Sequence, residues 1–493
     1  MTSLGARADE SLARFEDHPS LLFEGTWYRS HELGDRSRRA AAGFAALGVR
    51  PGDRVVIVMA NCPEVGLAYS ALWRAGAVPT PALFLLTEEE LRHVVSDSGA
   101  VAVVTTPEFL PKVQAAAPGL PVVVVGGEGG TPWEELEAHE PAALVDRSGA
   151  DLAALLYTGG TTGRAKGVAL THEGLDAVGK AASDAAYEPG RNTILLPLPL
   201  AHAYGLLVTV AGLHAREPGR SFLMRWFDPA GWIALVEEHR IQTSAMVPSM
   251  IQMLLAQPLE QHDLSCLQRV SSGAAPLARD VLEEFERRIP SVEVREGYGC
   301  TETSGLISSQ PAEERRIGSV GKPVTGVSVR IALPDGSDAK PGEDGEICVQ
   351  GPNLMQGYWH SEDATSYAIR DGWLHTGDVG HLDEDGYLYV VDRIKDLIIR
   401  GGFNVYPRDV EDVLLAHPSV AAAAVVGRPD AKLGEEVVAF VQLSSEVSPE
   451  ELIAYSKEHL GAYKYPREVR VVPAIPLTSV MKTDRKALRA QLQ

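Results

Sequence analysis

Apolar positions recur with two different spacings along the first 150 residues. Residues 54–59, 101–105 and 122–125 are apolar runs of strand length, whereas residues 38–47 and 64–75 have the spacing of apolar positions that is typical of helices. Strands that alternate with helices along a chain usually form one mainly parallel sheet covered by the helices. We therefore expect an α/β domain in this part of the chain.

The same alternation continues from residue 150 to residue 320, and strands are expected at residues 153–157, 193–196 and 243–247. Beyond residue 320 the pattern changes to the short β-runs VSVRIAL, GEICVQG and GYLYVVD, which are separated by turns rich in Gly and Asp. Short strands with such turns predict a small β-rich unit.

The last part of the chain has a further pattern of its own, which predicts a small α+β domain. Its expected elements are a helix at 407–415, strands at 420–426 and 436–443, and a helix at 450–460. The fold class is therefore expected to be α/β. A large N-terminal domain, residues 1–394, would hold two α/β sheet subdomains plus the small β-rich unit, and a small α+β C-terminal domain would span residues 395–493.

Composition and charge limit the class of protein. The 493 residues are 45 % hydrophobic with a mean hydropathy of −0.04, which is enough for a full globular core. The chain carries 66 Asp and Glu against 45 Lys and Arg, for a formal net charge of −21. Because nucleic-acid binding depends on clustered Lys and Arg, this balance argues against a nucleic-acid partner. A local basic pocket for a small phosphate compound remains compatible with it.

Cysteine spacing and apolar run lengths exclude further classes. The four cysteines, Cys62, Cys266, Cys300 and Cys348, are far apart and form no CxxC pair, so the spacing predicts neither a disulfide framework nor a zinc site. No apolar run approaches the roughly 18 residues of a membrane span, and the N-terminal segment lacks the apolar core of a signal peptide. We expect a soluble, cytoplasmic protein.

The segment LYTGGTTGRAKGV, residues 156–168, carries the strongest chemical signal. It follows an expected strand and contains four glycines, three threonines, Arg164 and Lys166. Glycines allow backbone N–H groups to surround an anion, and hydroxyl groups and cations complete a phosphate-binding loop. The spacing differs from a Walker A loop, which requires G-x-x-x-x-G-K-[ST]. We interpret the segment as a phosphate-binding loop of another kind.

Seven further motifs appear in order along nearly the whole chain, and together with this loop they resemble the adenylate-forming (AMP-binding) superfamily. That superfamily includes acyl-CoA synthetases, luciferases and peptide-synthetase adenylation domains, and the chain most resembles the fatty acyl-CoA synthetases and other acyl-CoA ligases. The motifs are LPLPLAHAYG (196–205), SSGAAPL (271–277), GYGCTET (297–303), GEICVQGPNLMQGYW (345–359), WLHTGDVG (373–380), VDRIKDLIIRGGFNVYPRDVE (391–411) and PLTSVMKTDR (476–485).

The resemblance implies a site for Mg-ATP. Tyr298 would stack on adenine, Glu302 and Thr162 would hold Mg²⁺, and Asp378 and Arg393 would bind the ribose. The positions that it assigns to cofactor binding are Thr158, Gly159, Gly160, Thr161, Thr162, Gly163, Lys166, Gly273, Ala274, Ala275, Tyr298, Gly299, Asp378, Arg393, Lys395, Gly401 and Gly402.

The resemblance also implies two half-reactions and the residues that catalyse them. Lys482 would contact the substrate carboxylate and the α-phosphate during adenylation, with Thr301, Glu302 and His202 as the other catalytic candidates. The C-terminal domain would then rotate about Lys395, bringing the segment at Gly401 and Gly402 towards the incoming thiol.

Three positions depart from the usual family pattern. Gly159 and Ala165 replace a Ser and a Pro of the phosphate loop, and Met481 replaces the Gly that commonly precedes the catalytic lysine. A Met adopts a positive φ only at a cost, so the loop that carries Lys482 is expected to be held differently. An adenylate-binding module that has lost catalysis is therefore one alternative. A luciferase-like oxygenase shares the fold and the first step, but nothing in the sequence favours it.

The expected substrate is a small-molecule monocarboxylic acid. Malonate-type relatives bind a second carboxylate with arginines at the positions of Met253 and Gly297, and without these cations a dicarboxylic acid would bury an unpaired charge. The apolar character of the expected pocket favours a medium- or long-chain fatty acid, with an aryl acid as the alternative. The pocket candidates are His202, Tyr204, Val247, Met250, Met253 and Gly299.

The acceptor and the oligomeric state are less well determined by the sequence. Coenzyme A is the expected thiol, and a phosphopantetheine carrier protein is the alternative because it presents the same thiol arm. Both a monomer and a homodimer are compatible with the sequence.

Overall fold

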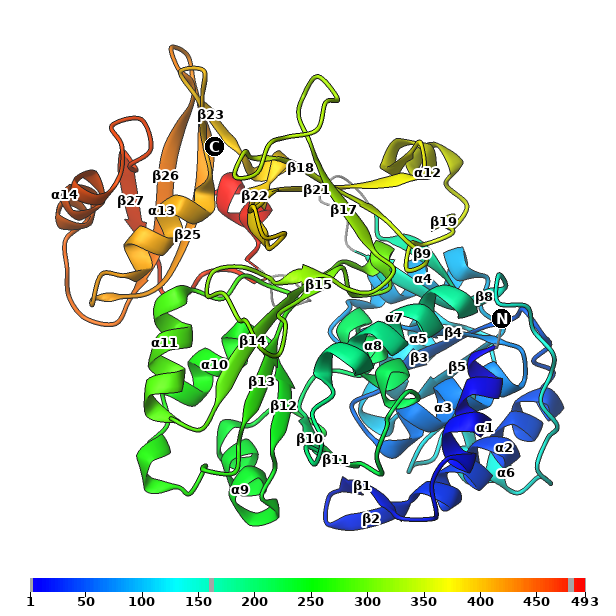
Figure 1. The fold of residues 1–493 in the computed structure, drawn as a ribbon. Helices are drawn as coiled ribbons and strands as arrows, with labels where there is room; N and C mark the ends of the chain where they lie inside the picture. Colours follow the sequence, from blue (N-terminus) through cyan, green and yellow to red (C-terminus); the bar gives the residue numbers. More distant parts are fainter. Residues whose placement is uncertain (1–2, 159–163, 478–482, 493) are drawn as a thin grey trace. The chain divides into compact units, whose positions relative to one another are not determined.

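The computed structural model describes residues 3–158, 164–477 and 483–492 (Figure 1). The chain divides into two compact units. The first comprises residues 1–277, 281–328 and 349–374, and the second comprises residues 278–280, 329–348 and 375–493. The expected fold class, α/β with a large N-terminal part of several sheets and a smaller C-terminal part, is confirmed.

The first sheet of the first unit has five parallel strands in the order β4-β3-β5-β6-β7. Its central strands β3 and β5 are buried along almost their whole length, as expected of strands covered on both faces by helices. The strands are β3 (Arg54–Val58), β4 (Val78–Pro81), β5 (Ala102–Thr105), β6 (Val122–Val124) and β7 (Thr131–Pro132). The helices of this part of the chain are α1 (Leu4–Ala13), α2 (Ser30–Ala46), α3 (Pro63–Arg74), α4 (Glu88–Ser98), α5 (Leu110–Ala116) and α6 (Trp133–Glu137).

The second sheet has nine strands in the order β16-β15-β14-β13-β12-β10-β11-β1-β2, and its centre, from β14 to β1, is parallel. The strands are β1 (Pro19–Phe23), β2 (Thr26–Arg29), β10 (Thr193–Leu196), β11 (Arg220–Leu223), β12 (Thr243–Met246), β13 (Arg269–Ser272), β14 (Glu293–Tyr298), β15 (Ser308–Ser309) and β16 (Lys322–Pro323). The helices of this region are α7 (His172–Ala186), α8 (Ala203–Gly212), α9 (Pro229–His239), α10 (Pro248–Leu255) and α11 (Arg279–Arg288).

The two faces of this second sheet differ in chemistry. Val270 and Val294 belong to an apolar core with residues of α9, α10 and α11. Since side chains alternate across a strand, Arg269, Ser271 and Arg295 project to the opposite face, and Ser271 is the register partner of Arg295.

The strand expected at residues 153–157 is present as β8 (Leu152–Thr158). It does not join the large parallel sheet, because β8 pairs antiparallel with β9 (Lys166–Thr171) in a separate sheet that β19 (Gly357–Tyr358) completes. Seven residues, 159–165, connect β8 to β9. A parallel pair needs a crossover of about a dozen residues or more, so this short connection requires a hairpin.

The second unit contains a sheet in the order β24-β23-β26-β25, with β27 parallel to β26. Its apolar core is formed by β23, β25, β26, α13 and α14, as the alternation of the sequence predicts. The strands are β23 (Ile398–Arg400), β24 (Phe403–Val405), β25 (Val420–Asp430), β26 (Gly434–Leu443) and β27 (Glu468–Val471), and the helices are α13 (Pro407–Leu415), α14 (Pro449–His459) and α15 (Arg485–Ala490).

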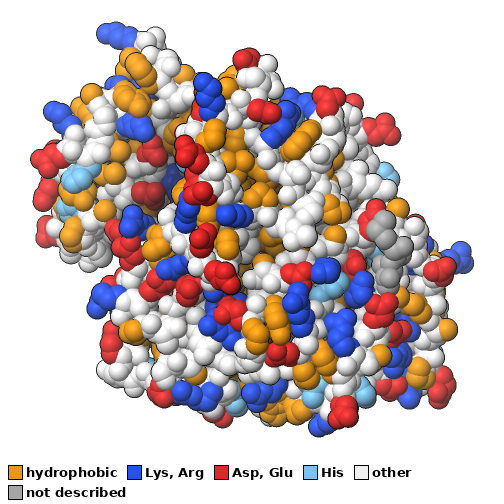
Figure 2. Space-filling model, viewed as in Figure 1, with side chains coloured by type: hydrophobic (Ala, Val, Ile, Leu, Met, Phe, Trp, Pro, Cys, Tyr) orange, Lys and Arg blue, Asp and Glu red, His pale blue; other side chains and the backbone are white. Residues whose placement is uncertain are grey.

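A further, mainly antiparallel sheet in the order β17-β18-β21-β20, with β22 beside β21, corresponds to the expected β-rich segment. Its strands are β17 (Ser328–Ala332), β18 (Gly345–Gln350), β20 (Ile369–Arg370), β21 (Trp373–Leu382) and β22 (Leu388–Arg393), and the short helix α12 (Glu362–Ala368) precedes β20. Of the helices in the described part of the chain, none combines the length and the apolar character needed to cross a membrane. On the face shown in Figure 2, acidic and basic side chains are interspersed.

Candidate active site

The glycine-rich segment is framed by the β8–β9 hairpin, in which Thr158 pairs with Lys166. The Tyr157 hydroxyl donates to Asp97 at 2.6 Å, and Nε2 of His93 lies 2.7 Å from the carbonyl oxygen of Ala165. Burial, reinforced by Asp97, raises the pKa of Tyr157 well above its usual range, so the phenol keeps its proton and remains a donor. Helix α4 therefore anchors both flanks of the segment. The predicted phosphate-binding residues Gly159, Gly160, Thr161, Thr162 and Gly163 lie outside the described residues.

Tyr358 contacts two side chains from separate segments of the chain. Its hydroxyl donates to Oε1 of Glu302 at 2.9 Å, and the ammonium nitrogen of Lys166 lies 5.0 Å from the centre of its ring. Burial and the neighbouring Glu302 raise the pKa of Tyr358 far above its usual range, so the hydroxyl remains a donor. The structure thus brings the predicted phosphate cation Lys166 and the predicted metal ligand Glu302 to one ring, which holds the carboxylate in place.

The segment around Glu302 is held by tight backbone contacts. Tyr298 ends β14, and residues Thr301–Thr303 form a 3₁₀ turn in which the Glu302 carbonyl oxygen accepts from the Met355 N–H at 2.8 Å. A Cβ at Gly299 would lie 2.4 Å from the Gly305 carbonyl oxygen, so only glycine fits between these segments. The carboxylate oxygens of Glu302 are hard ligands of the kind that Mg²⁺ prefers, so the donor chemistry fits that ion.

The expected acyl pocket begins at the start of α8. His202 is the N-cap of this helix, where its Nδ1 accepts from the Tyr204 N–H at 3.3 Å, and the Tyr204 hydroxyl donates to the Ser271 carbonyl oxygen at 3.0 Å. An Nδ1 that accepts belongs to a neutral ring with its proton on Nε2. The contact at Nδ1 is therefore a helix-capping contact, which orients the imidazole ring.

The loop after β13 continues from this tyrosine. A Cβ at Gly273 would lie 3.5 Å from the ring of Tyr204, so the loop backbone and the ring are close neighbours. Ala274 has a φ of +69°, an unusual conformation for a residue with a side chain, and Ala275 follows it. Strained backbone of this kind is concentrated at functional sites.

The other predicted pocket residues lie on or next to α10. Val247 is the N-cap residue of this helix, and Met250 packs against the apolar core formed with α9 and α11. Met253 is 46 % exposed at the surface of the helix. The structure therefore gives Met250 a contact in the protein core and leaves Met253 facing solvent.

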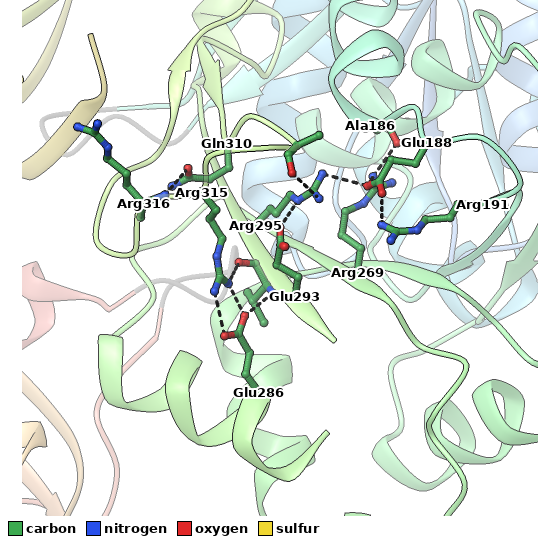
Figure 3. A network of polar contacts seen from close by, with 12 residues as sticks. Ala186, Glu188, Arg191, Arg269, Glu286, Glu293, Arg295, Gln310, Arg315 and Arg316 are labelled. Atoms are coloured by element: carbon green, nitrogen blue, oxygen red, sulfur yellow. Dashed lines mark hydrogen bonds and ion pairs between the residues drawn. The ribbon is translucent and has the colours of Figure 1, made fainter. Parts of the chain in front are cut away.

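A buried charged network lies on the same sheet face as Ser271 (Figure 3). Arg269 and Arg295 are each only 7 % exposed, and each places Nη1 3.1 Å from the carboxylate of Glu188. Arg269 also donates to the Ala186 carbonyl oxygen at 2.6 Å, and Arg295 pairs with Glu293. Burial, together with the nearby Arg295, lowers the pKa of Arg269. Ser271, whose carbonyl oxygen accepts from the Tyr204 hydroxyl, lies two positions after Arg269 on β13 and is the register partner of Arg295 on β14.

In the second unit, the two predicted ribose ligands form an ion pair. Asp378 on β21 and Arg393 on β22 are register partners, and Nε of Arg393 donates to Oδ1 of Asp378 at 2.8 Å. Asp378 is only 5 % exposed, and its N–H donates to the Thr376 hydroxyl at 3.1 Å. The ion pair with Arg393 therefore orients the carboxylate of Asp378.

The remaining predicted residues of this unit lie at its turns. Lys395 lies in a 3₁₀ turn, Ile394–Asp396, directly after β22. Gly401 and Gly402 connect β23 to β24 with φ of +59° and +84°, which glycine adopts without strain. Lys482 and Met481 lie outside the described residues.

Sequence reasoning missed Tyr358, Asp97 and the arginine network. Tyr358 stands within a quoted motif, yet its partner Glu302 is 56 positions away, and the pairing of Tyr157 with Asp97 spans 60 positions. Contacts at such separations leave no local pattern in one sequence. The order Glu293, Val294, Arg295 places Arg295 on the strand face opposite Val294, but it does not indicate the distant partner Glu188.

The glycine-rich sequence between β8 and β9, the positive φ of Ala274 after β13 and the Asp378–Arg393 pair are each features expected of the adenylate-forming class. Comparison with known proteins agrees with this assignment. Residues 8–359 match the AMP-binding enzyme family, and residues 409–482 match the AMP-binding enzyme C-terminal domain. The chain belongs to the AMP-binding enzyme family and is an AMP-forming acid–thiol ligase, as its motifs predicted.

Individual relatives cover nearly the whole chain. A feruloyl-CoA synthase of Amycolatopsis sp is 37 % identical over 97 % of this chain and 96 % of its own length. A long-chain-fatty-acid–CoA ligase of Yersinia pestis is 34 % identical over 99 % of this chain and 94 % of its own. The solved structure of the o-succinylbenzoate CoA synthetase of Bacillus subtilis with its acyl-adenylate intermediate has a TM-score of 0.88 at 30 % identity, covering 99 % of each chain.

Proposed function

We propose that this protein activates an aromatic monocarboxylic acid with ATP and then transfers the acyl group to coenzyme A. In the first step a carboxylate oxygen attacks the α-phosphorus of ATP and pyrophosphate leaves. In the second step the thiol sulfur attacks the acyl carbonyl carbon, AMP leaves and the thiol proton is released. Family membership supports the adenylate chemistry, and one observation, the charged network beside Tyr204, supports the choice of acid.

This network argues against a long alkyl chain. A chain that ran past Tyr204 along the face of β13 and β14 that carries the buried network would place methylene groups against Arg269 and Arg295, whose ionic partners it could not replace. An aromatic acid is short enough to end at the Tyr204 ring and to pack against it. The feruloyl-CoA synthase among the relatives, which is named for an aromatic acid, supports the same choice.

The nucleotide would bind between the hairpin segment and the Glu302 turn. Glu302 and Thr162 would hold Mg²⁺, which, when bound, offsets the charge of the phosphates. Lys166 adds a second positive charge on the hairpin side, and Tyr358 keeps the Glu302 carboxylate oriented. Lys482 would stabilise the negative charge that develops as the two anions meet.

Residues near the end of the N-terminal domain and residues of the C-terminal domain would contribute to the two steps. Asp378 and Arg393 would bind the ribose, since one carboxylate can accept from two neighbouring hydroxyl groups. Lys395 would serve as the hinge between the two half-reactions, and the slim turn at Gly401 and Gly402 would face the thiol arm. The proposed boundary between the N-terminal and C-terminal domains lies between residues 394 and 395.

A fatty acid is the second candidate substrate. The Yersinia pestis relative, which is 34 % identical, is named for long-chain fatty acids and supports this alternative. A holo carrier protein is the corresponding alternative acceptor, because it offers the same thiol arm as coenzyme A.

One experiment separates these candidates. Pyrophosphate release is measured with hydroxycinnamic, benzoic and C6–C16 fatty acids, each with CoA, with a holo carrier protein and with neither. We expect the highest kcat/KM for an aromatic acid in the presence of CoA. A preference for C12–C16 acids would overturn the choice of acid, and turnover only with the carrier would overturn the choice of acceptor. ATP binding without pyrophosphate release from any acid would identify a module that has lost catalysis.

A further inference from the structure

Three metal-binding side chains meet on two neighbouring strands of the second unit. Glu346 and Cys348 lie two positions apart on β18 and therefore on the same face, and His375 lies on the adjacent strand β21. Nδ1 of His375 is 2.7 Å from Oε2 of Glu346 and 3.3 Å from Sγ of Cys348. The three ligand atoms all lie within 4.8 Å of one another.

The imidazole nitrogen at the centre of this cluster faces two partners at once. Nδ1 has a single position in the ring plane, which holds either a proton or a lone pair. If Nδ1–H donates to Glu346, the nitrogen has no lone pair left to accept from the Cys348 thiol. A divalent cation would resolve this conflict, because the carboxylate, the imidazole lone pair and the thiolate would all point at the same ion.

Burial distinguishes this cluster from a nucleophilic site. Cys348 is 0 % exposed, so a substrate cannot reach its sulfur for covalent catalysis. The side chains of His375 and Glu346 are 12 % and 19 % exposed, which gives a small ion a route to the cluster. The cluster therefore contains one buried soft ligand, the sulfur of Cys348, and two harder ligands, His375 and Glu346, that are partly exposed to solvent.

The surroundings of Glu346 are already arranged as in a metal site. Its second oxygen, Oε1, accepts from the Gly377 N–H at 3.2 Å, so Oε2 can bind an ion while the backbone keeps the carboxylate oriented. Such outer hydrogen bonds commonly fix the ligands of protein-bound metals. The strand that carries His375 and Gly377 also carries Asp378.

We propose that Glu346, Cys348 and His375 form a binding site for a thiophilic divalent cation of the Zn²⁺ type. The thiol releases its proton as the sulfur–metal bond forms, and Nδ1 of His375 and Oε2 of Glu346 complete three protein ligands. Water occupies the fourth position of a tetrahedral ion. The bonds, about 2.3 Å to sulfur and about 2.0–2.2 Å to nitrogen and oxygen, require only small movements of these side chains.

The site can be tested by spectroscopy on the whole protein. The reduced protein, freed of metal by a chelator and dialysed, is titrated with Co²⁺. We expect one equivalent to give a thiolate-to-cobalt charge-transfer band in the near ultraviolet together with visible bands of a tetrahedral ion, and Zn²⁺ to displace it. Cys348→Ser should abolish the charge-transfer band. His375→Gln and Glu346→Gln should each weaken Co²⁺ binding by more than about tenfold, since even outer partners contribute that much.

The chain offers matched controls for each ligand type. His381 lies on the same strand and pairs with Asp344 at 2.8 Å, and Cys266 is the half-buried cysteine that contacts the Val236 carbonyl oxygen. His381→Gln and Cys266→Ser should leave the spectrum unchanged.

Two results would overturn the proposal: a wild-type protein without a charge-transfer band, or a band that survives Cys348→Ser. Near-ultraviolet circular dichroism checks that each variant is folded. If Cys348→Ser does not fold, the two glutamine variants decide, and unchanged affinity in both would reject the site.

Discussion

Tyr358 donates its hydroxyl hydrogen to Oε1 of Glu302 at 2.9 Å, across 56 positions of the chain. This bond joins the short strand β19 to the 3₁₀ turn at Thr301–Thr303, and the Lys166 ammonium approaches the same ring from β9. The tyrosine is therefore placed to orient the carboxylate that we assign to Mg²⁺.

Removal of this hydroxyl tests that assignment. Tyr358→Phe should lower kcat/KM for ATP by roughly 10- to 150-fold, because a hydrogen bond to a charged group contributes about 1.5–3 kcal/mol. The Mg²⁺ concentration for half-maximal rate should rise at the same time. Tyr187→Phe is a matched control, since Tyr187 also donates to a glutamate, Glu217, at 2.9 Å. Equal effects of the two substitutions would show that Tyr358 acts only on stability.

We assign Lys482 to the adenylation step and not to the thiol-transfer step. Lys482→Ala should abolish pyrophosphate release from ATP and acid, yet leave transfer of a preformed acyl-adenylate to CoA largely intact. The reason is that the lysine charge is needed only where two anions meet. Stopped-flow or quenched assays of each half-reaction give the comparison, with Lys486→Ala as the neighbouring control. A parallel loss of both steps would contradict the assigned role.

The charged network beside Tyr204 should limit acid length. Arg295→Met keeps most of the side-chain volume but removes the charge, and it should raise kcat/KM for C10–C14 acids relative to an aromatic acid by about tenfold or more. Arg287→Met at the protein surface, where Arg287 pairs with Glu284 at 2.7 Å, is the control. Removing one member of a buried pair also costs about 3–5 kcal/mol, so unfolding curves accompany the kinetics. If kcat/KM falls equally for C10–C14 acids and for the aromatic acid, the network contributes only to protein stability.

His172 should make the stability of the first unit depend on pH. It is fully buried, its Nδ1 accepts from the Leu4 N–H at 3.2 Å, and burial lowers its pKa to about 4. In the unfolded chain the pKa is near 6.5, so below that pH the unfolded state binds a proton that the folded state refuses. The free energy of unfolding should therefore be unaffected by this group above pH 6.5 and fall by about 3 kcal/mol between pH 6.5 and pH 4.

This contribution can be isolated by comparison of variants. Denaturant unfolding at pH 7 and at pH 4.5 should show a smaller pH-dependent loss in His172→Gln than in the wild type, whereas His31→Gln, an exposed site, should behave like the wild type. If His172→Gln keeps the full pH dependence, the histidine is not the group responsible.

The sequence by itself determined the family and the type of most elements. Helix Pro407–Leu415 and strand Thr193–Leu196 lie where the apolar pattern predicts them, because burial of one face imposes a period on the chain. Motifs such as GYGCTET and HTGD likewise indicated Glu302 and Asp378 as candidate site residues, because each motif is a run of consecutive residues. These signals are local, so one sequence contains them in full.

Only the tertiary structure decided which distant residues meet. The strand expected at residues 153–157 pairs in a separate antiparallel hairpin and not in the large parallel sheet, and Tyr358 contacts Glu302 from another segment of the chain. The cysteine spacing predicted no metal site, yet strand pairing places Cys348 beside His375, 27 positions away. Strand pairing and side-chain packing depend on the whole chain folding at once, so contacts of this kind leave no pattern in the neighbouring sequence.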